Sequence, residues 1–133
     1  MTHLRLTSTL PPDLEDVARR TIGALLEVHR ELGSGLGESV YAAAARIELQ
    51  ACGIPFESEK TLPVRYRGHL LGHYRVDLFV DSKLVVEVKS VEAVHPVHVA
   101  QVVSYLRLTG ARLGLIVNFN VPVLKQGIRR VVR

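Results

Sequence analysis

Hydrophobic positions along this chain change their spacing several times, and each spacing predicts an element. Apolar residues recur at helical intervals from Pro11-Pro12-Asp13 to about Leu32, with acidic residues in the first turn. A second helix is predicted from about Gly37 to Cys52, followed by Gly53 as a helix-ending residue. His95-Pro96 begins a third helix that runs to Leu108.

Shorter apolar runs between these helices predict four strands. They are Phe56–Arg65, Leu70–Val80, Leu84–Lys89 and Leu113–Asn118, and a last short helix is predicted over Val123–Val131. The order is α-α-β-β-β-α-β-α. Three consecutive strands, then a helical crossover to a fourth, predict an α/β (α+β) fold with a four-stranded mixed sheet flanked by helices.

The hairpin formed by the second and third predicted strands has a register fixed by its apolar positions. If Asp81-Ser82-Lys83 forms the loop, Val80 lies opposite Leu84, and one face is uniformly apolar because side chains alternate in a strand. That face carries Val76, Leu78, Val80, Leu84, Val86 and Val88. The other face carries Asp77, Phe79, Val85, Glu87 and Lys89. A two-residue loop would drive Glu87 into the apolar face, so the three-residue loop is favoured.

This register places Asp77 directly opposite Glu87, with Cβ atoms roughly 4.5–5.5 Å apart. Two carboxylates so close repel each other unless a cation lies between them or one is protonated. Lys89 points to the same side. The pattern favours a site for a hard cation such as Mg²⁺, and the competing interpretation is a solvated face with one salt bridge.

Length and composition describe one globular domain. The chain has 133 residues, 47% hydrophobic and 23% charged, and we expect a tail at residues 1–10 and a single domain over 11–133. The only cysteine, Cys52, excludes an internal disulfide and is expected to be a buried residue at a helix end. With no signal peptide and no apolar run of about 20 residues, we expect a soluble cytoplasmic protein without membrane contact.

Charge permits nucleic-acid binding. The formal net charge is +4, and most of the 17 basic residues are arginines, which favour two-point contact with phosphate. An excess of this size is compatible with a nucleic-acid partner but is common among other proteins.

Five motifs occur in order on the predicted elements. Gly35 to Tyr41 spells Gly-x-x-Glu-x-x-Tyr, and the others are Tyr74-Arg75-Val76-Asp77, Glu87-Val88-Lys89, Gln101 to Tyr105, and Leu113 to Phe119. From about Leu14 to Val132 the chain thereby resembles the GxxExxY protein family, a branch of the PD-(D/E)XK nuclease-like superfamily. The proline that gives the superfamily its name is replaced by Val76.

The resemblance implies a restriction-endonuclease-like core and a metal-dependent site. Asp77 and Glu87 would be metal ligands, and Glu38 would add to the metal shell from the start of the second helix. The backbone carbonyl of Val88 could join them. Lys89 would lie beside the attacking water or the scissile phosphate. The metal, Mg²⁺ or Mn²⁺, would act as a Lewis acid and activate water.

Residues around this centre have expected roles as well. Gln101 would orient the lysine or a phosphate, and Tyr105 lies one turn later on the same helical face. His73 and Arg75 share the strand parity of Asp77 and are expected to bind substrate. Tyr41 is expected to be a core or gate residue that hydrogen-bonds to a neighbour.

Histidine spacing suggests a zinc site only weakly. His69 and His73 flank a turn and a strand start, where i,i+4 does not bring two rings together. His95 and His98 straddle a helix start. Neither pair predicts a structural zinc.

We therefore expect a Mg²⁺- or Mn²⁺-dependent nuclease that acts on DNA rather than RNA, with low sequence specificity or a preference for a structure, and able to form a homodimer. Two alternatives remain. One is a nuclease-like domain, weak or inactive as an enzyme, that binds nucleic acid or a protein partner. The other is an enzyme for small nucleotides or other phosphate esters. A basic groove leading to Asp77 would favour a polymer substrate, and an enclosed pocket a small one.

Overall fold

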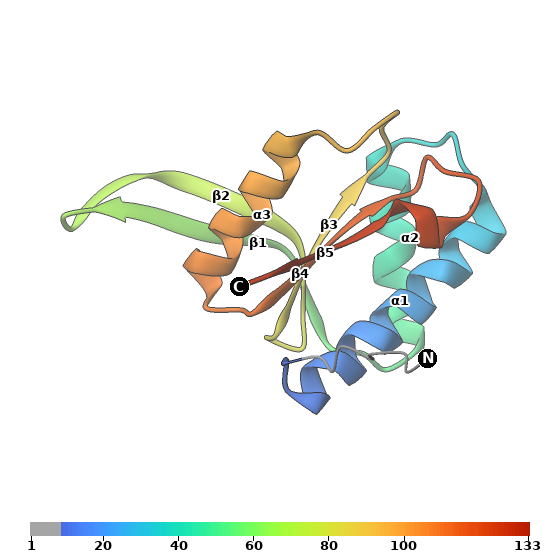
Figure 1. Ribbon diagram of the computed structural model, residues 1–133, viewed down its shortest axis with the longest axis horizontal. Coiled ribbons are helices and arrows are strands. Elements are labelled where there is room, and N and C mark those ends of the chain that lie inside the picture. Colours follow the sequence, from blue (N-terminus) through green and yellow to red (C-terminus); the bar gives the residue numbers. More distant parts are fainter. Residues whose placement is uncertain (1–8) are drawn as a thin grey trace, which may run out of the picture.

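The computed structural model describes residues 9–133. Its helices are α1 Pro12–Leu32, α2 Glu38–Ala51 and α3 Pro96–Thr109, with a 3-10 turn η1 Leu124–Gly127. Its strands are β1 Phe56–Tyr66, β2 His69–Val80, β3 Leu84–Lys89, β4 Leu113–Asn118 and β5 Ile128–Val132. They form one sheet in the order β1-β2-β3-β4-β5, in which only the β3–β4 pair is parallel (Figure 1). Helix α3 is the crossover between those two strands, so the mixed α/β architecture is confirmed.

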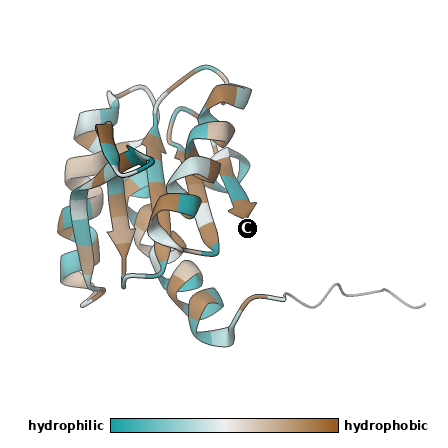
Figure 2. Ribbon diagram, turned by 90° about the vertical axis from the view of Figure 1, so that its left-hand side faces the viewer, coloured by the Kyte–Doolittle hydropathy of each residue, from teal (hydrophilic) through white to brown (hydrophobic). Residues whose placement is uncertain are grey.

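Helices cover both faces of the central strands. α1 and α2 pack with β2, β3 and β4 in one apolar cluster, and α3 packs on the opposite face in a second cluster. β3 and β4 are therefore buried on both faces, which explains their continuous apolar sequence. The strands in the middle of the sheet are accordingly coloured as hydrophobic in Figure 2.

The predicted last helix over 123–131 is wrong. The chain forms the short turn η1 and then β5, which pairs antiparallel with β4, so the sheet has five strands and not four. Without β5, the outer edge of β4 would leave its backbone amides and carbonyls unpaired, and strand pairing satisfies them. Val131 packs under α3 while Arg129 and Arg130 lie opposite Ile116 and Leu115. Tertiary pairing thus overrides the local helical spacing.

β1 and β2 form a long hairpin that extends beyond the body of the molecule (Figure 1). Its tip is a turn between Tyr66 and His69, which pair with each other. Arg67 and Gly68 have φ values of 48° and 80°, the left-handed conformation that a two-residue hairpin turn requires. At its other end the same hairpin enters the core next to β3.

The expected tail, residues 1–10, lies mostly outside the described residues, although Leu10 is buried in the core beside α1. Cys52 is exposed, which corrects the expectation that it is buried. Within residues 9–133, no helix is long and apolar enough to cross a membrane.

Candidate active site

The site forms where β2 and β3 separate. The predicted register is confirmed over three pairs, Leu78–Val86, Phe79–Val85 and Val80–Leu84, closed by the turn at residues 81–83. The ladder ends after Leu78–Val86. The next opposed pair is Asp77 and Glu87, and here side chains replace backbone pairing.

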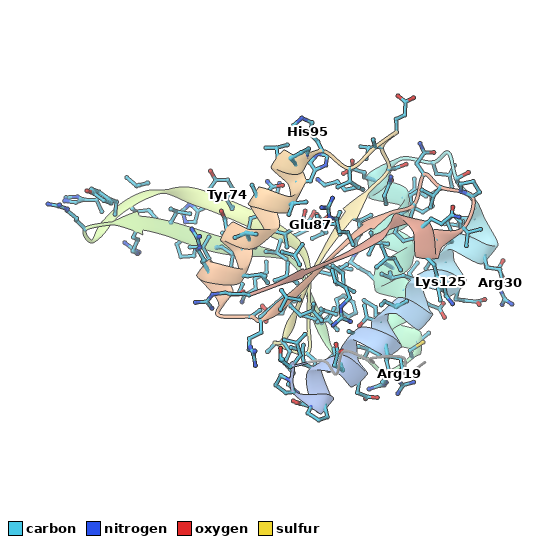
Figure 3. The ribbon with its side chains drawn as sticks, viewed as in Figure 1. Arg19, Arg30, Tyr74, Glu87, His95 and Lys125 are labelled. Atoms are coloured by element: carbon cyan, nitrogen blue, oxygen red, sulfur yellow. The ribbon has the colours of Figure 1, made fainter. Side chains whose placement is uncertain are left out.

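Each carboxylate accepts a hydrogen bond from the opposite strand. The backbone N–H of Asp77 donates to Glu87 Oε1 at 3.0 Å, and the N–H of Val88 donates to Asp77 Oδ2 at 2.8 Å. Glu87 is only 4% exposed and lies in the interior of the molecule, in contrast to Arg19 and Arg30 on α1 (Figure 3). The reciprocal bonds hold two acidic side chains together in the gap between two strands.

Burial and mutual repulsion keep this pair from ionising fully. Burial, followed by the charge of Asp77, raises the pKa of Glu87 to about 8. Burial also raises the pKa of Asp77, although the Val88 amide and the charge of Lys89 oppose the rise. Near neutral pH the two groups therefore retain a proton between them. A cation bound here would replace that proton.

Side-chain alternation along β2 breaks at this point. Val76 packs in the cluster under α3, whereas Leu78 packs with α1 and α2, so the predicted uniform apolar face holds for five residues and not for Val76. Glu59 of β1 lies between the residues that pair with Val76 and Leu78, and it has a φ of 51°. This left-handed residue marks an irregularity beside Asp77 that turns the side chain of Asp77 toward α2.

The α2 side of the gap holds a small acidic cavity. Its volume is about 240 Å³, and it is lined by Glu38, Ser39, Ala42, Arg46, Glu59, Asp77 and Val88. Glu38 is the first residue of α2, and its charge contributes to the raised pKa of Asp77. Glu38 and Asp77 thus line the same cavity.

The Gly-x-x-Glu-x-x-Tyr motif fixes the start of α2. Gly35 has a φ of 100°, which L side chains rarely adopt. The Tyr41 hydroxyl donates to the carbonyl of Gly33 at 2.5 Å and accepts from the N–H of Leu36 at 3.2 Å. Its ring is fully buried and stacks on Phe119 with centroids 4.4 Å apart. Tyr41 is a core residue that holds the loop before Glu38, as expected.

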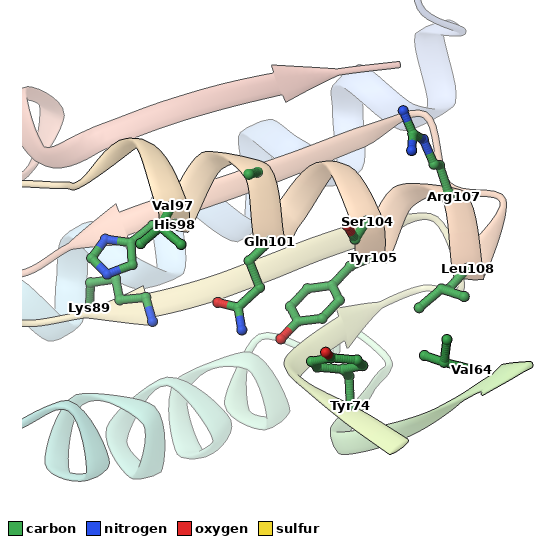
Figure 4. Close-up of a pocket in the computed structure, with 11 residues that line it drawn as sticks. Val64, Tyr74, Lys89, Val97, His98, Gln101, Ser104, Tyr105, Arg107 and Leu108 are labelled. Carbon is green, nitrogen blue, oxygen red and sulfur yellow. The ribbon is translucent and has the colours of Figure 1, made fainter. Parts of the chain in front are cut away.

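The α3 side of the gap holds a larger and mostly apolar groove of about 780 Å³. Lys89, Gln101 and Tyr105 all line it, which brings together three of the predicted site residues (Figure 4). Tyr105 is almost fully buried, and burial followed by the charges of Glu87 and Asp77 raises its pKa to about 12. Its phenol therefore stays neutral and able to donate a hydrogen bond.

His73 and Arg75 do not line this groove, and Tyr74 between them does. Both are exposed on β2 and share the parity of Asp77, away from α3. Neither residue lines either cavity of the site, and the substrate-binding role expected for both stays a prediction. Tyr74 was missed as a site residue, although it opens the motif that ends at Asp77.

Family comparison agrees with this geometry. The model of the PD-(D/E)XK nuclease superfamily matches residues 15–131, nearly the whole chain. The chain belongs to the PD-(D/E)XK nuclease superfamily. No curated protein and no solved structure matched it. Membership supports a nuclease-type function, and nucleases of this superfamily generally use divalent metals.

The donor set fits such a metal through two carboxylates. In residues 9–133, no group of three or more His, Cys, Asp and Glu side chains lies close enough to hold an ion together. Glu38 therefore does not complete a preformed three-carboxylate cage with Asp77 and Glu87. Mg²⁺ is usually bound through one or two carboxylates, with water and substrate oxygens completing its shell. Two opposed, partly protonated carboxyl groups match that requirement.

Polar contacts around the PD-(D/E)XK site hold the end of β3. The Asn118 side chain accepts from the N–H of Val91 at 3.0 Å and donates to the carbonyl of Val91 at 2.9 Å. The N–H of Phe119 donates to the carbonyl of Lys89 at 2.9 Å. These bonds fix the segment that follows Lys89, and the sequence showed Asn118 only as part of a motif.

The histidine pair at the start of α3 is a helix cap. His95 Nδ1 accepts from the N–H of Val97 at 3.0 Å, and His98 Nδ1 accepts from the N–H of His95 at 3.1 Å. Each side chain thereby satisfies a free amide at the helix start. His95 and His98 therefore have a structural role at the start of α3.

Proposed function

We propose that this chain is a divalent-metal-dependent nuclease that hydrolyses phosphodiester bonds, with DNA as substrate and low sequence specificity or a preference for a structure. One observation carries the proposal. Asp77 and Glu87 are held together by reciprocal hydrogen bonds, with raised pKa values, where β2 and β3 separate. A fold gains no stability from opposed buried carboxyl groups, so their presence favours a cation-binding role.

Asp77 and Glu87 would hold Mg²⁺ or Mn²⁺, with the carbonyl of Val88 beside them and Glu38 adding negative charge from the start of α2. When bound, the ion supplies Lewis-acid stabilisation of the charge that develops on the phosphate. The protein's own cation at this point is Lys89, whose charge acts on both carboxyl groups.

Residues that line the α3 groove would position the substrate next to that centre. Lys89 would hold a phosphate oxygen or the attacking water, and the Gln101 amide would orient either the ammonium or the phosphate. Tyr105 would remain a neutral hydrogen-bond donor. A 133-residue chain offers little surface for base readout, which favours low sequence specificity, and a homodimer would widen the footprint.

The alternative function is binding of nucleic acid or a protein partner without cleavage. The same carboxyl pair argues against it, because a site released from catalysis has no physical reason to retain a buried acid opposite a partly buried one. Cleavage therefore decides between the two functions.

The test is incubation of the purified protein with plasmid, linear, single-stranded and branched DNA and with RNA, in Mg²⁺, Mn²⁺ or EDTA. We expect metal-dependent cleavage of DNA that Asp77→Asn reduces by roughly 10²–10³-fold or more. Asp81→Asn is the matched control. Asp81 lies in the turn of the β2–β3 hairpin, at the end far from Asp77, and contacts Lys83. The control should cleave at the wild-type rate.

Two results would contradict the nuclease proposal. One is the absence of cleavage of every polymer with either metal. The other is cleavage at the same rate by wild type and Asp77→Asn, since that activity would come from elsewhere.

A further inference from the structure

The groove on the α3 side is a surface in its own right. It runs along α3 and is closed on its other side by the β1–β2 hairpin. Lys89 and His98 lie at one end, Tyr74 and Tyr105 in the middle, and Val64 near the other end beside Leu108 (Figure 4). Its volume of about 780 Å³ is within the range of ligand sites. The Lys89 end opens at the proposed metal centre.

Aromatic and apolar side chains line this groove and remain in water. Tyr74 is 52% exposed, and Val97 and Leu108 are exposed as well. The rings of Tyr74 and Tyr105 lie 6.3 Å apart between their centroids and are tilted by 57°. Exposed apolar walls that continue into a catalytic centre are typical of a surface that a ligand covers.

Charge around the groove favours an anionic ligand. The described residues that line it include Lys89, Arg107 and His98 but no carboxylate. The hairpin that forms its wall has no Asp or Glu from residue 60 to 76. By contrast, the small cavity on the α2 side is lined by three acidic residues. A negatively charged chain would therefore enter from the α3 side.

The arginines of the β1–β2 hairpin, like several others on the described surface, form no ion pair with a carboxylate, whereas three arginines elsewhere do. Arg19, Arg30 and Arg130 each contact a carboxylate. Within residues 9–133, none of the hairpin arginines has an ion pair; they are Arg65, Arg67 and Arg75. These hairpin arginines do not line the groove, so the cations available to a phosphate inside it are Lys89 and Arg107, beside the stacking surfaces.

We propose that this groove binds the unpaired bases of a single-stranded nucleic acid, with Tyr74 as an exposed stacking surface, and delivers the adjoining phosphate to Lys89. A nucleic-acid single strand is the ligand that combines an anionic backbone with free π-faces. A duplex conceals those faces within its stack, and an acidic peptide does not require rings. The inference rests on the proposed function only for the position of the cut phosphate.

Tryptophan fluorescence tests the contact directly, because the chain has no tryptophan. Tyr74→Trp places a single indole in the groove. Tyr66→Trp is the matched control, since Tyr66 lies near the tip of the same hairpin, is 59% exposed and does not line the groove. In EDTA, so that nothing is cut, oligo(dT) and oligo(U) are titrated into each variant. We expect at least one of the two strands to quench the indole of the Tyr74→Trp variant, and little change in the fluorescence of the Tyr66→Trp variant.

Affinity provides the second measurement. Fluorescence anisotropy with the labelled oligonucleotides in EDTA should show that Tyr74→Ala weakens single-strand binding roughly 5- to 100-fold, while Tyr74→Phe and Tyr66→Ala change it less than about twofold. Comparison of oligo(dT) with oligo(U) distinguishes DNA from RNA. Because these variants lie on an exposed hairpin, loss of folding is not expected.

The outcomes separate this inference from the nuclease proposal. If wild type cleaves but Tyr74→Ala binds single strands as wild type does, the inference is wrong and the nuclease proposal stands. If Tyr74→Ala impairs binding but no substrate is cleaved, the inference stands and the catalytic proposal fails. Two further results would overturn the inference. One is tighter binding of blunt duplex than of either single strand, with no dependence on Tyr74. The other is a protein partner that occupies the groove in place of nucleic acid.

Discussion

The two sides of the separated β2 and β3 strands have opposite chemistry. On the α2 side, a cavity of about 240 Å³ is lined by Glu38, Glu59 and Asp77 with a single cation, Arg46. On the α3 side, a groove of about 780 Å³ is lined by rings and cations, without a carboxylate among its described residues. The acidic side suits a metal and the other side suits a substrate, and Glu87 with its partner Asp77 lies at the boundary.

The difference originates in the strand geometry. A regular ladder would place Asp77 and Glu87 on the same face, as the register predicted. The break in alternation at Asp77 turns its carboxylate toward α2, whereas Lys89 at the end of β3 lines the α3 groove. One irregularity thus separates the acidic cavity on the α2 side from the groove of rings and cations on the α3 side. If this division holds, variants on the two sides should fail in different ways.

Among the variants that test the contrast between the two sides, Lys89→Met on the α3 side is expected to have the largest effect. It removes the cation nearest to the carboxyl pair, and we expect cleavage to fall roughly 10²–10³-fold, because one charged group that stabilises the transition state is lost. Raising the Mg²⁺ or Mn²⁺ concentration should not restore the rate. Steady-state cleavage over a metal titration measures this.

Lys83→Met serves as the control for Lys89→Met. Lys83 directly precedes β3, the strand that ends at Lys89, and therefore lies at the opposite end of that strand. It forms an ion pair with Asp13 at 3.1 Å. Its variant should cleave like wild type. Recovery of the Lys89→Met rate at high metal concentration would show that Lys89 acts on metal binding, and the division between the two sides would be wrong.

The dependence of folding stability on pH tests whether the carboxyl pair between the two sides holds a proton. The folded protein keeps a proton on Glu87 up to about pH 8, whereas the unfolded chain releases it near 4.5, so the folded state binds more protons between these values. Stability is therefore fully present below the unfolded pKa and is lost as the pH rises toward 8. The slope approaches about 1.4 kcal/mol per pH unit for one group.

Urea unfolding in EDTA at several values from pH 5 to 8.5 measures this slope. Glu87→Gln, which keeps an oxygen to accept from the N–H of Asp77, should remove most of the pH dependence and be more stable than wild type at pH 8.5. Mg²⁺ should stabilise wild type most at the alkaline end, because it replaces the proton. Parallel stability curves for wild type and Glu87→Gln would refute the buried-proton interpretation.

The residues of the candidate site differ in whether their positions could be predicted from the sequence. The apolar alternation of β2 and β3 was sufficient to predict the register that opposes Asp77 to Glu87, because a one-residue slip would bury a charge. Family resemblance added Glu38 and Gln101, and both line cavities of the site. Local pattern and recognised motif thus indicated residues that the fold brings around the two cavities of the candidate site, and the family match supports the fold.

Features that depend on distant contacts were not predictable. β5 was taken for a helix because its partner is the edge of β4, and no local spacing encodes that pairing. The turn of Asp77 toward α2 depends on Glu59 in a neighbouring strand. Tyr74 lines the groove because α3 packs beside the hairpin, with Tyr105 next to it. Parity along one strand indicated His73 and Arg75, and it gave no sign that Tyr74 lines the groove.

The smallest effect is expected on the α2 side, from Glu38→Gln. Glu38 is exposed at the start of its helix and makes no closed cage with Asp77 and Glu87, so it should raise metal affinity through charge alone. We expect the metal concentration for half-maximal cleavage to rise roughly tenfold. A loss of this size is typical when a residue that supports the direct metal ligands is replaced. The rate at saturating metal should stay within about twofold of wild type. Glu48→Gln, near the other end of the same helix, is the matched control. If saturating metal does not restore the cleavage rate of Glu38→Gln, Glu38 acts on the reaction step as Lys89 is expected to do. The contrast between a metal-binding side and a substrate-binding side would then be wrong.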